Sequence, residues 1–219
     1  MSIRRTTQPD APDADCTLCP RLAAFRAANR EAYPDWHNAP VPSVGVLDAA
    51  LLIVGMAPGL RGANRTGRPF TGDHAGLLLY ETLIEQGFAT GPYAADPNDA
   101  LRLIDCRVAN AVRCVPPANL PTPAEARTCN TFLAAEIAAM PRLRAILALG
   151  TLAHAAVLRA RGLRLSGYKF AHGALHALPG GLALADSYHV SRYNTSTRRL
   201  TAEMFGAVIE RLREELAPA

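Results

Sequence analysis

Apolar residues gather in four short runs along the chain, and glycine or polar residues bound each run. The runs cover residues 50–55, 106–112, 144–150 and 182–187. Unbroken apolar runs of this length are typical of strands that are buried on both faces, as in parallel sheets. The pattern therefore predicts four strands that form one buried sheet.

Helical periodicity fills the stretches between and after these runs. We predict helices over residues 76–87, 123–140, 151–161 and 197–216, where apolar side chains recur every three or four positions. Thr122 supplies a cap for the second of these helices. Strands that alternate with helices indicate right-handed βαβ units. The predicted fold class is α/β, a three-layer α/β/α sandwich around a four-stranded, mainly parallel sheet.

Composition agrees with one folded domain. Apolar residues make up 49% and charged residues 19% of the 219 residues, which excludes a disordered chain. Residues 1–15 are polar and are predicted to form a flexible segment ahead of a single domain over residues 16–219. The chain has neither a run of 18 apolar residues nor an apolar leader. We therefore expect a cytoplasmic monomer without a membrane partner.

The basic side chains hint at a phosphate-bearing partner. The formal net charge is +4, and Lys169 is the sole lysine among 23 basic residues. Arginine suits phosphate because its planar guanidinium donates two hydrogen bonds at once. This excess permits binding to nucleic acid. It equally fits a bias in genome composition.

Five cysteines argue for a metal site or reactive thiols in an intracellular chain. Cys16 and Cys19 form a CxxC motif, and Cys114 and Cys129 follow far downstream. Four thiolates can saturate a zinc ion or the irons of a [4Fe–4S] cluster, so cluster, zinc and unliganded thiols all fit this spacing. Cys106 lies in a predicted strand and is expected to be a buried core residue.

Ligand sites in such sheets lie beyond the carboxyl ends of the strands. After the first strand, residues 55–76 contain six glycines, which allow close approach to a ligand. This loop matches neither a Walker A motif nor the GxGxxG fingerprint. Within it, Asp73 can act as a helix N-cap, where the helix dipole would favour its ionised form, or in catalysis. Phe70 can pack the loop or stack on a planar ligand.

The loops after the second and fourth strands carry further polar side chains. Asn110 either ties two loops together or reads a ligand with one donor and one acceptor. The loop 187–199 is rich in hydroxyls and contains His189, Ser191, Arg192 and Asn194. That composition fits contact with phosphate, and it equally fits a cap for the last helix at residues 195–197.

Four stretches together resemble the uracil-DNA glycosylase superfamily, and in particular its iron–sulfur branch, family 5 or type B. They are CTLCPRL (16–22), GMAPG with RGANRTGRPFTGD (55–73), NAVRCVPPANLPTPAEARTC (110–129) and SYHVSRYNTSTRRLT (187–201). The resemblance runs from Cys16 to the last helix. One departure is Val190, which stands where the family's loop usually has proline and which removes a fixed φ.

The resemblance implies a role for individual residues. Cys16, Cys19, Cys114 and Cys129 match the ligands of a [4Fe–4S] cluster. Asp73 matches the carboxylate that activates water, and Asn110 and His189 match residues beside the base, so these three are the catalytic candidates. The base-binding residues implied are Gly55, Met56, Ala57, Phe70, Asn110 and His189. Contacts to DNA are expected from Arg61, Asn64, Arg65, Ser191, Arg192 and Asn194.

The implied activity is a monofunctional DNA glycosylase that acts on damaged DNA. It flips uracil out of the helix and hydrolyses the N-glycosidic bond, leaving an abasic site. The apolar Ala57, typical of family 5, extends the expected substrates to hypoxanthine and xanthine. Two alternatives stay open: a metal-stapled nucleic-acid-binding module without catalysis, and a hydrolase or transferase that acts on free nucleotides.

Overall fold

A computed structural model describes residues 10–217, so the first nine residues of the predicted flexible segment lie outside the described part of the chain. Its main sheet has five strands in the order β4-β1-β5-β7-β6. Four of these strands are parallel and fall on the four predicted runs: β1 (Leu51–Gly55), β4 (Cys106–Asn110), β5 (Ala145–Leu149) and β7 (Leu182–Ser187).

The fifth strand corrects the predicted strand number. β6 (Leu175–Leu178) pairs antiparallel with β7 at the edge of the sheet. It contains His176, and three of its four residues retain some solvent exposure, so it lacks the apolar run that marks a buried strand.

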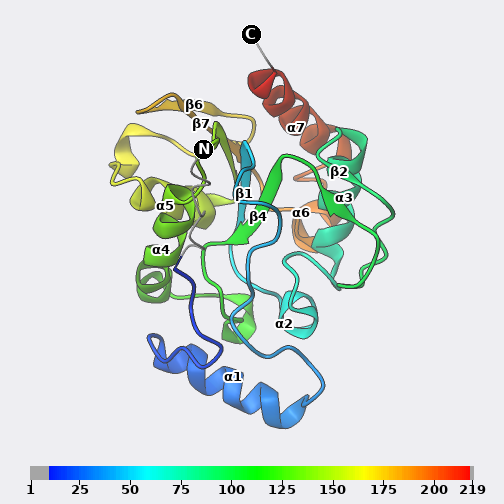
Figure 1. Cartoon of the computed structure of the whole chain (residues 1–219), viewed down its shortest axis with the longest axis vertical. Helices are drawn as coiled ribbons and strands as arrows, with labels where there is room; N and C mark the ends of the chain where they lie inside the picture. Colours follow the sequence, from blue (N-terminus) through cyan, green and yellow to red (C-terminus); the bar gives the residue numbers. More distant parts are fainter. Residues whose placement is uncertain (1–9, 218–219) are drawn as a thin grey trace, which may run out of the picture.

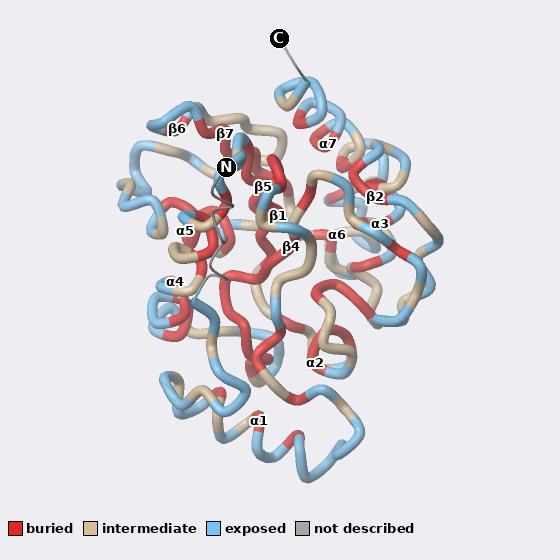
Figure 2. The backbone as a smooth tube through the Cα atoms, in the orientation of Figure 1, coloured by how far each residue is buried: buried red, intermediate tan, exposed pale blue. Residues whose placement is uncertain are grey.

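Helices cover both faces of this sheet, which confirms the three-layer α/β/α architecture (Figure 1). α3 (His74–Glu85) and α7 (Ala202–Leu216) pack on one face. α4 (Pro123–Ala138) and α5 (Thr151–Ala160) pack on the other. Buried backbone therefore runs through the centre of the molecule (Figure 2).

Shorter elements complete the fold. α1 (Pro20–Ala32) lies at one end of the molecule, far from the C-terminal helix (Figure 1). The remaining elements are α2 (Ala63–Thr66), the pair β2 (Ala89–Thr90) and β3 (Arg102–Leu103), α6 (Arg192–Ser196), and the 3-10 turns Pro117–Asn119 and Leu165–Gly167. None of the helices in residues 10–217 is both long and apolar enough to cross a bilayer.

Side-chain caps set the starts of the helices. Thr122 and Glu125 form a capping box at α4, as the sequence predicts. The last predicted helix, over residues 197–216, begins only at Ala202 as α7, because Arg198 adopts a left-handed φ of 57° between α6 and α7. Thr201, rather than residues 195–197, caps α7 by accepting a hydrogen bond from the Met204 N–H at 3.2 Å.

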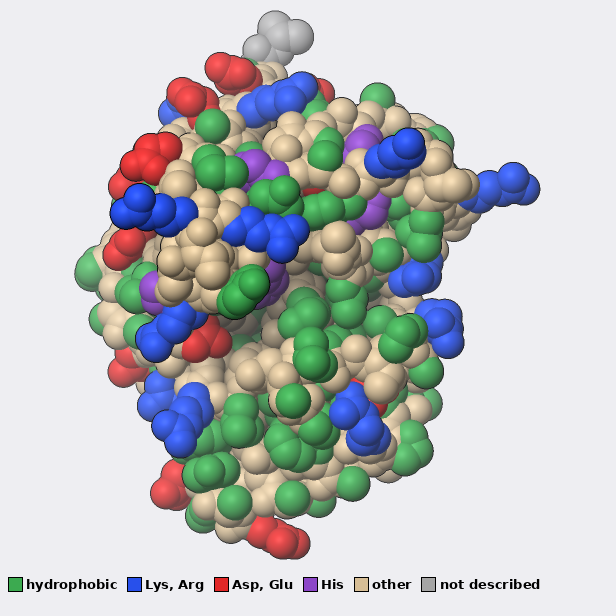
Figure 3. Space-filling view, turned by 180° about the vertical axis from the view of Figure 1, so that it is seen from behind, with side chains coloured by type: hydrophobic (Ala, Val, Ile, Leu, Met, Phe, Trp, Pro, Cys, Tyr) green, Lys and Arg blue, Asp and Glu red, His purple; other side chains and the backbone are tan. Residues whose placement is uncertain are grey.

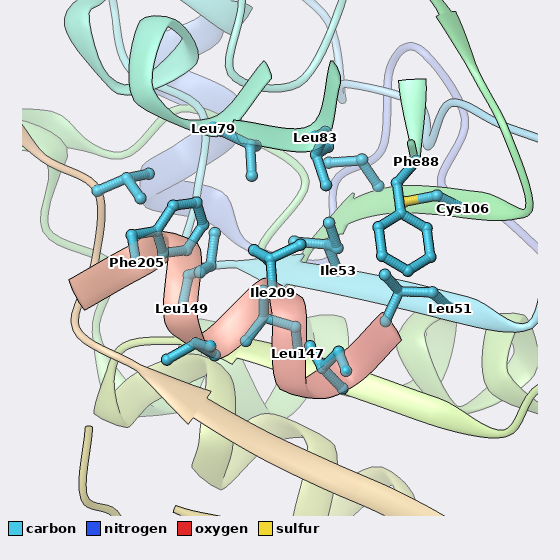
Figure 4. Packing of buried hydrophobic residues seen from close by; sticks show 14 of the residues in the cluster. Leu51, Ile53, Leu79, Leu83, Phe88, Cys106, Leu147, Leu149, Phe205 and Ile209 are labelled. Atoms are coloured by element: carbon cyan, nitrogen blue, oxygen red, sulfur yellow. The ribbon is translucent and has the colours of Figure 1, made fainter. Parts of the chain in front are cut away.

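The larger part of the core lies between the sheet and the helices α3 and α7. Figure 4 shows Leu79 and Leu83 of α3 with Phe205 and Ile209 of α7 beside the strands. Cys106 belongs to this cluster and is 1% exposed, so the prediction of a core cysteine is confirmed.

Two ionic groups each join a buried carboxylate, Glu136 or Asp186, to two basic side chains. In the first, Glu136 of α4 accepts hydrogen bonds from Arg107 at 2.6 Å and from Ser43 at 2.7 Å, and it pairs with Arg113. In the second, Asp186 of β7 accepts from His154 at 2.7 Å and from His176 at 3.2 Å. The other ring nitrogen of His154 faces the Tyr168 carbonyl at 3.0 Å. Burial lowers the pKa of His154, but the hydrogen bond and charge of Asp186 outweigh it and raise that pKa above 6.5.

Candidate active site

A cavity of about 630 Å³ lies beyond the carboxyl ends of the parallel strands. Its walls come from the glycine-rich loop after β1, the end of β4, the start of α5 and the loop after β7. Nine predicted site residues line it: Met56, Ala57, Phe70, Asp73, Asn110, His189, Ser191, Arg192 and Asn194. Segments that are far apart in the sequence therefore form one site.

Gly55 lies beneath the cavity and allows two of its walls to meet. A Cβ at this position would collide with the Phe70 ring and with Oδ1 of Asn110. Gly55 thus acts by its lack of a side chain, because any larger residue would displace both groups.

Phe70 is held in an uncommon backbone conformation. Its φ is 52°, in the left-handed region that bulky residues rarely adopt. The Tyr93 hydroxyl donates to the Phe70 carbonyl at 3.0 Å, and the Tyr80 hydroxyl donates to the Pro69 carbonyl at 2.6 Å. Neighbouring Arg68 forms a two-pronged pair with Asp99 at 2.7 and 2.8 Å. These contacts fix the ring, which is 6% exposed, against the cavity.

Asn110 and His189 present polar groups to the same space. Within residues 10–217, neither side chain makes a hydrogen bond, so both are free to bind a ligand. The rings of His189 and Phe70 are neighbours, with centroids 6.1 Å apart. Burial lowers the pKa of His189 to about 4. At neutral pH the imidazole is therefore uncharged and offers one N–H donor and one acceptor.

Asp73 is both a helix cap and a lining residue of the cavity. Its Oδ1 accepts a hydrogen bond from the Ala75 N–H at 3.1 Å at the start of α3. Oδ2 lies against Gly59 and Gly62, where any Cβ would collide with it. Burial raises the pKa of Asp73, and the N–H groups of Ala75 and Gly76 offset only part of that rise. Asp73 does sit at the N-terminus of α3, where the helix dipole favours the ionised form, but its burial acts in the opposite direction.

The loop after β7 is ordered without its usual proline. Val190 is fully buried in the core cluster. The Asn194 side chain donates to the His189 carbonyl at 2.8 Å, and Ser191 caps the short helix α6. Burial and these hydrogen bonds thus supply the rigidity that a proline would give, and they leave Arg192 exposed at the rim of the cavity.

The expected DNA contacts in the glycine-rich loop divide into two groups. Arg61 and Arg65 both reach solvent, and Arg65 donates to the Arg61 carbonyl at 3.0 Å. Asn64 is 1% exposed and donates to Oδ1 of Asn38 at 2.9 Å. The expectation that Asn64 contacts DNA is therefore wrong, because this amide joins two buried loop segments. Basic side chains are scattered over the surface in Figure 3.

The four predicted metal ligands lie next to this cavity, because Ala57 and Leu152 line the cavity and also pack against the cluster that contains Cys114 and Cys129. Cys16, Cys19, Cys114 and Cys129 all line one small apolar pocket between α1, the end of β4 and α4. The Arg113 N–H lies 3.4 Å from the Cys129 Sγ. Burial raises the pKa of Cys114 to about 11, so a free thiol there would be protonated at neutral pH. A metal centre would supply the charge that turns these groups into thiolates.

Comparison with known proteins matches most of the chain to a single superfamily. Residues 42–213 match the family model described as the uracil DNA glycosylase superfamily. The chain belongs to the uracil-DNA glycosylase superfamily. A Thermus thermophilus relative named type-5 uracil-DNA glycosylase is 48% identical over 200 residues, which cover 89% of this chain and 90% of the relative.

Other relatives give the same subdivision. A Pyrobaculum aerophilum protein of the same name is 37% identical over 201 residues, covering 90% of this chain and 87% of its own. A Thermotoga maritima protein named type-4 uracil-DNA glycosylase matches 42% of this chain and 41% of its own, at 40% identity. The resemblance to family 5 and the assignment to a superfamily of N-glycosylase enzymes are thus confirmed.

Sequence reasoning missed two features of this glycosylase fold. Tyr193 lies on α6 between Arg192 and Asn194, which line the cavity, and it is 71% exposed. An aromatic residue in a polar loop gives a signal only once its exposure is known. The second feature is α1, whose buried residues include Arg26 and Asn29, so that no apolar stripe marks it.

Proposed function

We propose that this protein removes uracil, and deaminated purines such as hypoxanthine and xanthine, from DNA. It acts as a cytoplasmic monomer, hydrolysing the N-glycosidic bond and leaving an abasic site. One observation carries the proposal: Phe70, Asn110, His189 and Asp73 line the same cavity at the carboxyl edge of the sheet.

Recognition of an extruded base fits three of these groups. Flipping a nucleotide out of a duplex costs a few kcal/mol, and stacking on an aromatic ring offsets about 1–3 kcal/mol of it. The fixed Phe70 ring supplies that surface, and the free amide of Asn110 matches the donor and acceptor edge of a base. A cavity of about 630 Å³ has room for a purine as well as a pyrimidine.

Bond cleavage then needs a donor near the base and an anion near the sugar. As the C1′–N bond breaks, its electron pair passes to the base nitrogen and positive charge develops on the sugar. Neutral His189 can donate a hydrogen bond to the departing base. The Asp73 carboxylate supports the sugar charge and orients the water whose oxygen bonds to C1′. Its raised pKa helps it to accept the proton that this water loses.

A [4Fe–4S] cluster is proposed for the pocket of four cysteines. Four thiols on one pocket wall supply the complete ligand set, and the Arg113 N–H directed at Cys129 fits the hydrogen bonding that cluster sulfurs receive. When bound, the cluster serves as a structural staple. The chain's own residues place α1 beside the end of β4 and α4, next to the DNA-binding loops.

Iron content tests that cofactor. Purified protein is expected to be brown and to carry about four irons per chain, as measured by metal analysis and visible absorbance. Cys114→Ser should lose the colour and solubility, whereas Cys106→Ser should keep the colour because Cys106 lies in the core. Colourless protein with one zinc per chain would contradict the cluster.

Arg192 is proposed to bind phosphate. Because it is exposed at the rim of the cavity, Arg192→Ala should weaken binding to all duplexes alike and lower the salt-dependence slope by about one. Arg213→Ala is the matched control, since Arg213 is exposed on α7 and pairs with Glu210. Fluorescence anisotropy over a salt series measures both. A change in which damaged base is preferred would refute the assignment.

Tyr193 is proposed to fill the gap that a flipped base leaves in the duplex. Tyr193→Ala should slow base release from duplex DNA by about 5- to 150-fold, from a stacking loss of about 1–3 kcal/mol. Single-stranded DNA has no such gap, so its rate should change little, and Tyr193→Phe should behave as wild type. Equal losses on both substrates would argue against this role.

The decisive experiment is a glycosylase assay on a panel of duplexes, each with one damaged base. Free base and an abasic strand support the proposal. DNA binding without base release would favour a non-catalytic module, and activity on mononucleotides but not on DNA would favour a nucleotide hydrolase.

A further inference from the structure

Among residues 10–217, two arginines are buried, and they differ in their partners. Arg26 and Arg113 are each 5% exposed. Arg113 pairs with the carboxylate of Glu136. In the described residues, no carboxylate lies within ion-pairing distance of Arg26. The acid nearest in sequence to its contacts, Asp15, is exposed and pairs with Arg30 at 2.6 Å. A buried charge without a counter-charge is strongly unfavourable, so the partner of Arg26 must lie elsewhere.

The contacts of Arg26 lead to the cysteine pocket. Nη1 donates to the Cys114 Sγ at 3.6 Å, and Nη2 donates to the Cys16 carbonyl at 2.8 Å. Four neutral thiols would leave the guanidinium without an opposite charge. Four thiolates around a [4Fe–4S]²⁺ core carry a net charge of −2, because the ligands bring −4 and the core brings +2. The buried cation and the buried anionic centre would then offset each other.

From these contacts we infer that Arg26 is the charge partner of the cluster and sets its reduction potential. The inference rests on the proposed cluster and goes beyond its structural role. Reduction adds one electron and takes the net charge from −2 to −3, so a fixed positive charge at the sulfur favours the reduced form. Arg26 is a positioning and tuning residue and does not line the base cavity.

Three variants separate charge from hydrogen bonding. Arg26→Gln keeps a donor and removes the charge. Arg26→Lys keeps the charge and loses the forked geometry. Arg30→Gln is the control on the same helix, because it removes an ion pair with Asp15 and hydrogen bonds to the Ala14 and Asn38 carbonyls, and none of these contacts involves a cysteine. Iron content, the midpoint of a dithionite-coupled titration followed by visible absorbance, and the rate of iron loss to a chelator are measured on each holoprotein.

Arg26→Gln is expected to shift the midpoint to lower potential and to lose iron about 10- to 100-fold faster than wild type. Arg26→Lys and Arg30→Gln should stay close to the wild-type midpoint. A wild-type midpoint in Arg26→Gln, or an equal shift in Arg26→Lys, overturns the inference. If Arg26→Gln does not fold, Arg26→Lys decides alone: a loaded cluster near the wild-type midpoint supports the charge, and a lost cluster overturns it.

These outcomes are distinct from failure of the proposed function. Wild-type protein without iron would refute the cluster itself, whatever the Arg26 variants do. Wild-type protein with iron and an unchanged Arg26→Gln would refute the tuning role only. Base release from uracil-containing DNA is measured separately and is expected to persist in every variant that retains its iron.

Discussion

Replacing Asp73 by asparagine is expected to slow single-turnover base release by roughly 10²–10⁴-fold, the range for a positioned acid–base group. DNA binding should stay near the wild-type level. Asparagine is as good an N-cap as aspartate, so the bond to the Ala75 N–H survives while the negative charge is lost. The lower part of the range is expected, because DNA phosphates also stabilise positive charge on the sugar.

The same variant should be at least as stable as wild type at neutral pH. Burial raises the pKa of Asp73 above 3.8, so the folded state binds this proton more tightly than the unfolded state. Its ionisation therefore lowers stability as pH rises through the window from 3.8 to the raised pKa, and the Asp73→Asn substitution removes that loss. Urea unfolding and rapid-quench kinetics over pH measure the two effects.

Two results would contradict the catalytic role. A single-turnover rate within about threefold of wild type would mean that Asp73 is only a cap. In wild type, the rate should fall as pH falls through the raised pKa of Asp73. If the rate of the Asp73→Asn variant falls at low pH just as the wild-type rate does, another group causes that fall, and His189 would be tested next.

Replacing Glu136 by glutamine is expected to cost about 3–5 kcal/mol of unfolding free energy, because it leaves buried arginine charge without its partner. Glu136 is 2% exposed and lies between Arg107 and Arg113. Urea unfolding measures the loss. Glu210→Gln is the control, because its pair with Arg213 is exposed and contributes little. A loss below about 1 kcal/mol would contradict this account.

The pH dependence of stability gives a second readout of Glu136. Burial alone would raise the pKa of Glu136, but the charges of Arg113 and Arg107 hold it below 4.5. A lowered carboxyl pKa contributes stability above 4.5, and this contribution is lost as pH falls through the folded value. Wild type should therefore lose stability over that acidic window, and Glu136→Gln should lose less.

The sequence predicts those elements of the fold whose buried residues form a continuous apolar run. Strands β1, β4, β5 and β7 are largely apolar because both faces are covered, so their runs stand out. β6 lies at an edge and keeps polar character. α1 buries Arg26 and Asn29, and polar side chains on a buried face leave no periodic apolar signal.

Some residues of the candidate site could be predicted from the sequence, and others could not. Residues at or just after the end of a strand, such as Asn110 and His189, are found by the rule that ligands bind at the carboxyl ends of strands. Asn64 of α2 escapes sequence reasoning because an asparagine looks the same in sequence whether it faces solvent or pairs with Asn38. Asp73 both caps α3 and lines the cavity, and the sequence does not reveal this double role because it depends on three-dimensional packing.

The docking of α1 has a consequence for how the chain is made. Leu22 packs on Val112, Cys114, Ala126 and Cys129, and Arg21 pairs with Glu125 across 104 residues of sequence. At translation rates of about 5–20 residues per second, the partners of α1 leave the ribosome roughly 5–20 s after it. The helix synthesised first therefore has no surface to bind during that interval, and Cys16 and Cys19, which precede it, stay exposed to solvent.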